Sequence, residues 1–524
     1  MTTPSPEPHA GPESGHPGRL PATWLLVFIQ AAVAAASLVV EIVAGRMLAP
    51  YLGMSLYTWT SVIAVVLAGF SVGHWAGGRI AEKAAPQALD WMAWSLAGAA
   101  VTTAGAVFLL RWSASYVIPA LDHPIAAIAA LTTLVFFLPS FFAGIPAPVL
   151  AKVAVTARPE RAGRALGAMF AAGAGGAIAG TLLAGFLFIS WLGSVGTLAS
   201  VTAVYAALAL LAFQAARGAG RVASPAALGV ALGAGLLLPL GLAGLSLAQP
   251  DPCTRESDYF CIRVLDASAE AGEPARLMVL DHLGHGISVQ SDPRRLVTPH
   301  GAILDGLARG RMAGRPFSAY FIGGGSYSIP RAWATLDGRV EITVAEIDPA
   351  VTAVAVEHFW FDPESARVLH DDARRALLVE AATYDVVIGD AFTDIAVPAH
   401  LVTREFFELV RARLAPRGVY LMNVVDFADR LDALAAVVHT LRAVFPVVEV
   451  WAERTAPAPG ARLVFIVMAG ETATPFAQMT SAAPDLLPSG RLSPEAVDAL
   501  VARRRPPILT DDYAPIDRLM GRLD

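Results

Sequence analysis

Acidic residues follow apolar segments in the second half of the chain. Glu346 and Asp348 come after a β-branched run, Asp390 directly follows the apolar run Tyr384–Gly389, and Asp372 lies between them. Carboxylates at strand ends can attract a cationic ligand and can accept a proton from it. The pattern predicts that these residues converge on one site. For Asp390, a carboxylate that caps a loop or helix is the alternative.

Three consecutive glycines, Gly323, Gly324 and Gly325, end the apolar run that begins at Tyr320. A spacer of about one helix separates them from the β-branched run that delivers Glu346. A tight turn against a ligand needs residues without a Cβ, and an acidic residue roughly 20 positions later can accept both ribose hydroxyls. The pattern predicts a nucleoside-binding β-α-β unit. A glycine-rich turn in another kind of α/β domain is the alternative.

The elements that must position these residues alternate between strands and helices. Strands are expected near 384–389, 418–424, 446–451 and 462–468, and helices near 300–308, 403–414 and 427–444. Such alternation predicts a doubly wound, Rossmann-like, mostly parallel sheet over 301–524. Short apolar pieces split by Gly, Glu and Pro predict a small β-hairpin region over 251–300. Ligands of such sheets bind beyond the carboxyl ends of the strands.

Four motifs in a fixed order carry a resemblance to a known family. They are Ile-Gly-Gly-Gly at 322–325, Ala-Glu-Ile-Asp at 345–348, Asp-Asp-Ala-Arg at 371–374 and Tyr-Asp-Val-Val-Ile-Gly-Asp-Ala-Phe at 384–392. Over roughly Leu277 to Asp426 the chain resembles the spermidine synthase family. With the apolar segments described below, it looks more closely like the bacterial proteins that join a multi-span membrane region to a spermidine synthase-like domain.

The resemblance implies roles for individual residues. Glu346 would hold the ribose of an adenosylated sulfonium donor, Asp372 the adenine amino group, and Asp390 would face the acceptor amine and take its proton. The predicted donor-binding set is Gly323, Gly324, Gly325, Ser326, Arg331, Glu346, Asp348, Asp372 and Ala373. No metal and no permanently bound cofactor is expected, because the donor is a co-substrate.

The chain also departs from the family pattern. Gln290 and His300 fall where the family has its acceptor-binding Gln and His, but Pro299 replaces a tyrosine, and Asp394 follows Asp390 at an altered spacing. Ser326 stands where the soluble enzymes carry an aspartate that binds the amine of decarboxylated S-adenosylmethionine. Arg331, one helical turn away, could instead pair with the carboxylate of intact S-adenosylmethionine.

The first half of the chain has the composition of a membrane protein. Of all residues, 55% are hydrophobic and 16% are charged. Residues 1–20, rich in Pro, Gly and Ser, predict a disordered tail, and 21–250 predict a membrane domain of about seven helices. The seven apolar segments lie near 23–44, 56–78, 92–111, 124–150, 164–189, 193–214 and 225–248. Without basic clusters interleaved with aromatics, nucleic acid is not an expected partner.

Basic residues and cysteines indicate how the chain is oriented across the membrane. Arg79 and Lys83, Lys152 to Arg164, and Arg217 and Arg221 cluster in loops that share one side of the expected bundle. The positive-inside rule makes that side cytoplasmic and, with seven spans, places the C-terminal domain outside, although adenosylated donors are expected in the cytoplasm. Cys253 and Cys261 could form a disulfide, which would agree with an outside domain, or could be two buried thiols.

Together these patterns predict a transferase anchored in the cell (inner) membrane that moves an aminopropyl-type group to a polyamine. Methylthioadenosine would be released, and a homo-oligomer is compatible with the sequence. A methyltransferase that uses S-adenosylmethionine on the same fold is one alternative. A transporter or sensor whose nucleoside domain only binds its ligand is the other.

Overall fold

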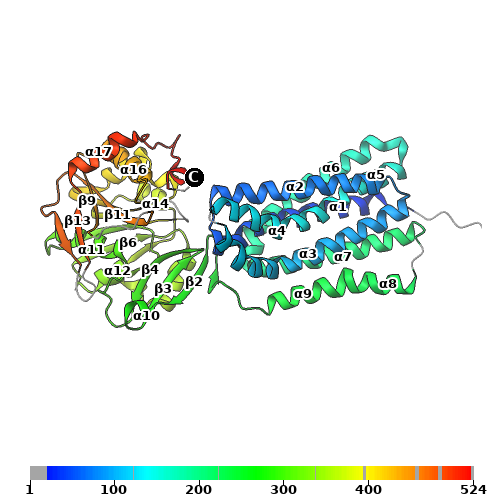
Figure 1. Ribbon diagram of the computed structural model, residues 1–524, viewed down its shortest axis with the longest axis horizontal. Coiled ribbons are helices and arrows are strands. Elements are labelled where there is room, and N and C mark those ends of the chain that lie inside the picture. The colour runs from blue at the N-terminus through cyan, green and yellow to red at the C-terminus, as the bar shows by residue number, and fades with distance from the viewer. Residues whose placement is uncertain are drawn as a thin grey trace, which may run out of the picture. The chain divides into compact units, whose positions relative to one another are not determined.

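The computed structural model describes residues 20–121, 123–221, 224–336, 338–392, 397–454, 460–481 and 487–520. They form two compact units, shown in Figure 1. The first comprises the chain up to Ala44 together with Ser61–Pro250, and the second comprises Gly45–Thr60 together with Asp251–Asp524. All but the last residue of the expected tail lies outside the described residues.

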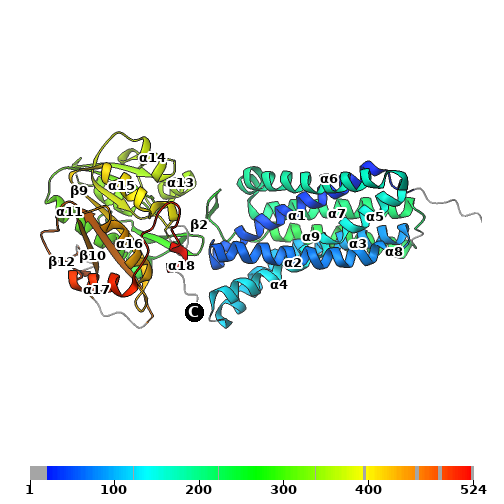
Figure 2. The same ribbon diagram turned by 90° about the horizontal axis from the view of Figure 1, so that it is seen from above.

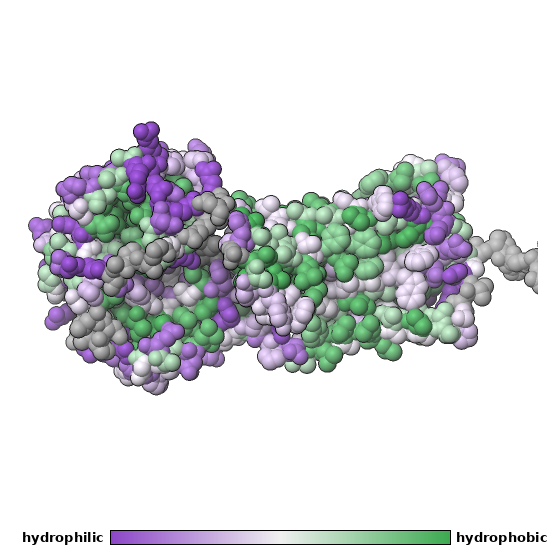
Figure 3. All heavy atoms as spheres, in the orientation of Figure 1, coloured by the Kyte–Doolittle hydropathy of each residue, from purple (hydrophilic) through white to green (hydrophobic). Residues whose placement is uncertain are grey.

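The apolar half of the chain is helical. Its helices are α1 (Thr23–Leu52), α2 (Leu56–Ala81), α3 (Ala85–Ala120), α4 (Pro124–Gly144), α5 (Pro146–Ala157), α6 (Ala162–Leu183), α7 (Ile189–Gly218), α8 (Pro225–Leu232) and α9 (Leu238–Leu247). Figure 3 shows hydrophobic side chains along the bundle, and exposed ones include Trp75, Phe170 and Trp191. Such exposed apolar area is what contact with lipid tails requires.

Six stretches of the described residues are long and apolar enough to cross a membrane, against the seven segments expected. The difference lies in Pro159–Gly218, a single stretch of 60 residues that contains both 164–189 and 193–214. A straight helix of that length would measure about 90 Å, three times the bilayer core. Non-helical angles at Gly193 (φ 67°, ψ 176°) break the stretch, and α6 and α7 occupy the same length of the bundle in Figures 1 and 2.

Glycines let the helices of the bundle approach closely. A Cβ at Gly73 or Gly77 of α2 would collide with the carbonyl oxygens of Phe141 and Ile145, and a Cβ at Gly176 of α6 would collide with that of Ala31. In lipid, where apolar packing gains nothing from leaving water, such close contacts stabilise helix association. These glycines are therefore structural.

The second unit begins with a small antiparallel sheet of four strands in the order β1-β2-β3-β4. The strands are β1 (Arg255–Glu256), β2 (Cys261–Asp266), β3 (Ala275–Leu280) and β4 (Leu283–Val289). Asp281, with a positive φ of 54°, makes the tight connection between β3 and β4. The expected hairpin region is confirmed.

A larger sheet of nine strands follows, in the order β12-β13-β10-β11-β9-β8-β5-β6-β7. The strands are β5 (Phe317–Ile322), β6 (Val340–Ala345), β7 (Arg367–Leu369), β8 (Tyr384–Gly389), β9 (Leu414–Phe427), β10 (Val447–Glu453), β11 (Arg462–Gly470), β12 (Gln478–Thr480) and β13 (Pro488–Arg491). In the run β7-β6-β5-β8-β9, each strand pairs in parallel with the next. The pairs β9–β11, β11–β10, β10–β13 and β13–β12 are antiparallel. The sheet is therefore mixed rather than mostly parallel.

Helices cover both faces of this sheet because each strand alternates its buried side chains between the faces. On β5, Tyr320 and Ile322 join the core beneath α14 (Ala373–Val379), α15 (Arg404–Ala412), α16 (Asp432–Arg442), α17 (Pro494–Arg504) and α18 (Ile516–Met520). Ala319 and Phe321 join the opposite core beneath α11 (Pro299–Met312), α12 (Ser328–Ala334) and α13 (Pro349–His358). The short α10 (Ser268–Ala271) packs on the small sheet.

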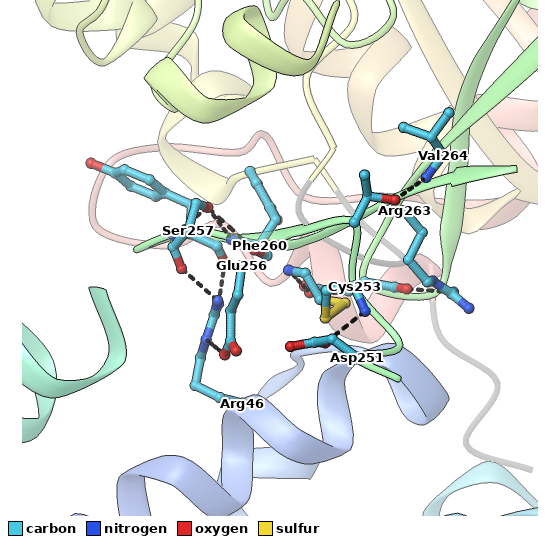
Figure 4. Close-up of a disulfide and its surroundings, with 12 residues drawn as sticks. Arg46, Asp251, Cys253, Glu256, Ser257, Phe260, Arg263 and Val264 are labelled. Carbon is cyan, nitrogen blue, oxygen red and sulfur yellow. Dashed lines mark hydrogen bonds and ion pairs between the residues drawn. A yellow bond between two sulfur atoms is a disulfide. The ribbon is translucent and has the colours of Figure 1, made fainter. Parts of the chain in front are cut away.

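The two cysteines form a disulfide that closes the loop between residues 253 and 261 (Figure 4). Within this loop, the Ser257 hydroxyl donates to Asp348 Oδ2 over 2.5 Å. Arg46, which belongs to the same unit, donates to the carbonyl oxygens of Ser257 and Tyr259 over 2.7 and 2.5 Å. The loop is thus fixed by a covalent bond and by hydrogen bonds.

Candidate active site

A cavity of about 180 Å³ opens where the strand order reverses, between β5 and β8. Open α/β sheets bind their ligands at such a switch point, beyond the carboxyl ends of the strands. The lining residues come from the strand ends, the small sheet and two loops. They are Tyr259, Phe260, Leu280, His285, Gly323, Gly325, Ala345, Glu346, Ile347, Asp372, Ala373, Asp390, Ala391, Phe392, Pro398, His400 and Leu401.

The glycine turn after β5 forms one wall of the cavity. Gly323 and Gly325 have positive φ angles of 91° and 50°, which side chains with a Cβ rarely adopt. A Cβ at Gly323 would also lie 3.0 Å from the carbonyl oxygen of Asp390. At Gly324 the physical reason differs from the expected one, because a Cβ there would collide with the Tyr327 ring rather than fill the cavity.

Glu346 follows β6 and lies beside the glycine turn. Its Oε2 accepts from the backbone N–H of Gly324 over 2.8 Å, and its Oε1 accepts from that of Asp348 over 3.0 Å. Burial raises the pKa of the Glu346 carboxyl, and these backbone donors oppose that effect. Each oxygen retains a lone pair, so the carboxylate can still accept hydrogen bonds from a pair of hydroxyls in the cavity.

Asp372 and Ala373 begin α14 at the next strand end. Asp372 caps that helix by accepting from the backbone N–H of Arg375 over 3.0 Å, and His400 Nε2 lies 2.7 Å from its Oδ2. Burial raises the pKa of Asp372, but the bonds from Arg375 and His400 outweigh it and lower the pKa. Asp372 is therefore both a helix cap and a charged group at the cavity wall.

Asp390 directly follows β8, and its backbone N–H donates to Ile322 at the end of the neighbouring strand over 3.1 Å. Asn423 Nδ2 donates to Asp390 Oδ1 over 2.9 Å, and His300 Nε2 lies 3.9 Å from Asp390 Oδ2. Among the described residues, the nearest group found at Oδ2 is thus the His300 ring, and Asp390 lines the cavity. A group in this position can accept a proton from a ligand.

Two predicted donor residues lie behind the cavity wall. The carboxylate of Asp348 caps α13 by accepting from Ala350 over 2.9 Å and also holds Ser257. The Ser326 side chain is 2% exposed and packs beneath Gly286 of β4. Neither lines the cavity, so they support it rather than contact its contents.

Arg331 and Gln290 lie elsewhere. The Arg331 guanidinium donates to the carbonyl oxygens of Val289 and Gln290, over 2.6 and 3.2 Å. The exposed Gln290 lines a different surface cavity beside Trp360. The structure therefore does not bring Arg331 to the place where a donor carboxylate would pair with it. Asp394 lies outside the described residues.

Several lining residues were not predicted. His285 of β4 lies beside Gly325, and its Nε2 has no hydrogen-bond partner among the described residues. Burial lowers the pKa of His285 to about 4. Tyr259, Phe260 and His400 complete the wall from loops. No motif marks these residues in the sequence, because the way the small sheet and loops pack on the large sheet is a tertiary property.

The charge of the lining is one-sided. It contains the carboxylates of Glu346, Asp372 and Asp390 and, in the described part of the chain, no lysine or arginine. Carboxylates in a partly dry cavity favour cationic ligands and disfavour anionic groups.

The C-terminal region of the chain is similar to known proteins. No family model matches the chain. The C-terminal region is 32% identical over 135 residues to a polyamine aminopropyltransferase of Vibrio vulnificus, covering 25% of this chain and 44% of that protein. It is 32% identical over 140 residues to a probable polyamine aminopropyl transferase of Bifidobacterium longum, covering 26% and 31%. The chain thus resembles polyamine aminopropyltransferases, although it spans less than half the length of these relatives.

Two further comparisons give partial matches. An N-terminal histidine N-methyltransferase of Emericella nidulans is 30% identical over 132 residues, covering 24% of this chain and 23% of that protein. Among solved structures, a probable spermidine synthase from Corynebacterium glutamicum has a TM-score of 0.41 at 22% identity, covering 49% of this chain and 96% of that one.

Proposed function

We propose that the chain transfers an aminopropyl group from decarboxylated S-adenosylmethionine to an amine acceptor, anchored by its apolar helices in a membrane. The observation that carries this proposal is the cavity at the β5/β8 switch point, where three carboxylates gather and the described lining residues include no lysine or arginine. Both the sulfonium donor and the ammonium acceptor are cations, so one carboxylate-lined cavity attracts both.

The reaction is a direct displacement. The neutral nitrogen of the acceptor attacks the methylene carbon next to sulfur, and the carbon–sulfur bond breaks with its electron pair passing to the sulfonium. Methylthioadenosine leaves as a neutral thioether, the attacking nitrogen becomes a secondary ammonium, and the proton that this ammonium releases passes to Asp390 Oδ2. The protein contributes alignment, exclusion of water and this proton acceptor.

The lining favours the decarboxylated donor over the intact one. Intact S-adenosylmethionine carries a carboxylate that needs a cationic partner, and Arg331 is occupied by two backbone carbonyl oxygens outside the cavity. Near Asp390 that carboxylate would meet a like charge. The decarboxylated donor lacks this carboxylate, so the repulsion is absent and all of its charged groups are positive.

Product analysis tests this function. Purified full-length protein is incubated with either donor and a mixture of polyamines, and the products are identified by mass spectrometry. We expect methylthioadenosine together with an aminopropylated amine, from the decarboxylated donor only. S-adenosylhomocysteine would instead establish methyl transfer, and an unchanged donor that still binds would point to a sensor or transporter.

We further propose that the C-terminal unit faces the oxidising side of the membrane. The basic residues Arg79, Lys83, Arg161 and Arg221 lie in or beside loops that join the helices at one end of the bundle. Disulfides such as that of Cys253 and Cys261 form and persist in oxidising compartments and are rare in the cytosol. A membrane-impermeant thiol reagent should label Ala499→Cys, exposed on α17, in intact cells and should label Lys83→Cys only after lysis. The reverse pattern would overturn this orientation.

A further inference from the structure

The sequence Thr510-Asp511-Asp512-Tyr513 forms a tight turn close to the C-terminus. Thr510 and Tyr513 exchange both backbone hydrogen bonds, each over 3.0 Å. The turn is anchored on both sides, because Leu509 before it and Ile516 after it are buried in the core. The backbone N–H of Leu509 also donates to Thr440 Oγ1 on α16 over 2.9 Å. The turn is therefore held rigidly on the second unit.

This turn presents Asp511 to Arg374, one residue beyond the start of α14. Both terminal nitrogens of the Arg374 guanidinium donate to the Asp511 carboxylate, each over 2.7 Å. Such a bidentate pair fixes direction as well as distance. The hydrogen bonds from Arg374 lower the pKa of Asp511 to about 2, so the pair stays charged at physiological pH.

Arg374 in turn holds a part of the cavity wall. Its Nη1 donates to the carbonyl oxygen of His400 over 3.1 Å, and the His400 ring lies 2.7 Å from Asp372. The residue before the turn also contacts the chain that follows His400: the backbone N–H of Arg404 donates to the Leu509 carbonyl oxygen over 2.8 Å. A continuous series of contacts thus joins the C-terminal turn to Asp372 and His400.

We propose that Asp511 is a positioning residue for the adenine end of the donor. By orienting Arg374 it fixes the His400 backbone, and His400 then sets the direction of the Asp372 carboxylate that faces the cavity. This inference rests on the proposed function, because it assigns the Asp372 end of the cavity to the nucleoside. It gives the C-terminal turn a role in donor recognition without any contact between Asp511 and the donor.

The Arg374–Asp511 pair is too exposed to contribute much to the stability of the fold. The side chains of Arg374 and Asp511 are 26% and 44% exposed. Exposed ion pairs contribute only about 0 to 1 kcal/mol to the free energy of unfolding. Removing the Asp511 charge should therefore change the geometry at Asp372 while leaving the fold intact.

Calorimetric titration of methylthioadenosine into the full-length protein tests the proposal. Asp511→Asn should weaken binding by about 5- to 50-fold, because the bidentate charged pair is lost. Asp512→Asn is the matched control: Asp512 is also exposed, and among the described residues its side chain makes no hydrogen bond or ion pair. The control should bind as the wild type does. In turnover assays, Asp511→Asn should raise the KM for the donor, and its kcat should stay within about twofold of the wild-type value.

The exchanged pair Arg374→Asp with Asp511→Arg should recover part of the lost affinity, which a damaged fold would not allow. Equal affinity of Asp511→Asn and the wild type would overturn the positioning role, and so would equal losses in Asp511→Asn and Asp512→Asn. Wild-type protein that fails to bind methylthioadenosine would instead contradict the proposed function.

Discussion

Asn423 donates a hydrogen bond to Asp390 over 2.9 Å, from the strand next to the one that Asp390 follows. Asn423 is buried, with 4% of its surface exposed. The bond occupies Oδ1 of the carboxylate, whereas Oδ2 lies 3.9 Å from His300 Nε2. Asn423 thereby determines which oxygen of Asp390 can accept a proton.

Asn423→Ala should lower kcat by about 10- to 100-fold, since a hydrogen bond to a charged group is worth about 1.5 to 3 kcal/mol. The donor KM should stay within about threefold, because Asn423 does not line the cavity. Asn423→Asp should shift the acidic limb of the pH–rate profile to higher pH, because a second carboxylate raises the pKa of the pair. Full turnover by Asn423→Ala would exclude this role.

His285 gives the fold a pH dependence with a definite sign. Burial lowers its pKa to about 4, from 6.5 for the free side chain. Between these values the unfolded chain binds a proton that the folded chain does not, so stability falls as pH decreases from 6.5 to 4. His285→Gln should make thermal unfolding in detergent less sensitive to pH in this window and should have no such effect above pH 7. An unchanged pH dependence would show that the imidazole titrates freely.

Reduction of the Cys253–Cys261 disulfide should weaken donor binding. The loop that it closes carries Ser257, which holds Asp348, and the lining residues Tyr259 and Phe260. Fixing one released residue again on binding costs about 1 to 2 kcal/mol, so we expect methylthioadenosine affinity to fall by about fivefold or more.

The double variant Cys253→Ser with Cys261→Ser is the control for this experiment. It should show the same weaker affinity without reductant and should not respond when reductant is added. Wild-type affinity in the double variant would mean that the hydrogen bonds of Ser257 hold the loop without the covalent bond.

The part of the site that follows strand ends is visible in the sequence. Gly323, Glu346 and Asp390 each come shortly after an apolar run, and parallel pairing brings such strand ends to one edge of the sheet. The fold class could be predicted for the same reason. The antiparallel half of the sheet could not, because apolar runs such as those of β10 and β11 do not reveal strand direction.

The other wall of the site depends on packing between distant segments. His285 and Tyr259 come from the small sheet and the disulfide loop, and His400 is placed by Arg374. Arg331 is a residue that spacing placed in the site although the structure does not. It lies one helical turn from Ser326, but its guanidinium donates to the Val289 and Gln290 carbonyl oxygens. Spacing along the chain predicts which residues share a strand end or helix turn, but not which carbonyl oxygens lie within reach of a long side chain.

The turnover of Asp390→Asn tests the account most directly. The asparagine keeps the shape of the side chain but loses the basic lone pair that takes the proton from the attacking amine. With decarboxylated S-adenosylmethionine and a polyamine, methylthioadenosine production should fall by about 10²- to 10⁴-fold, while calorimetric affinity for methylthioadenosine stays near that of the wild type. Full turnover by Asp390→Asn would contradict the assignment of Asp390 as the proton acceptor in aminopropyl transfer.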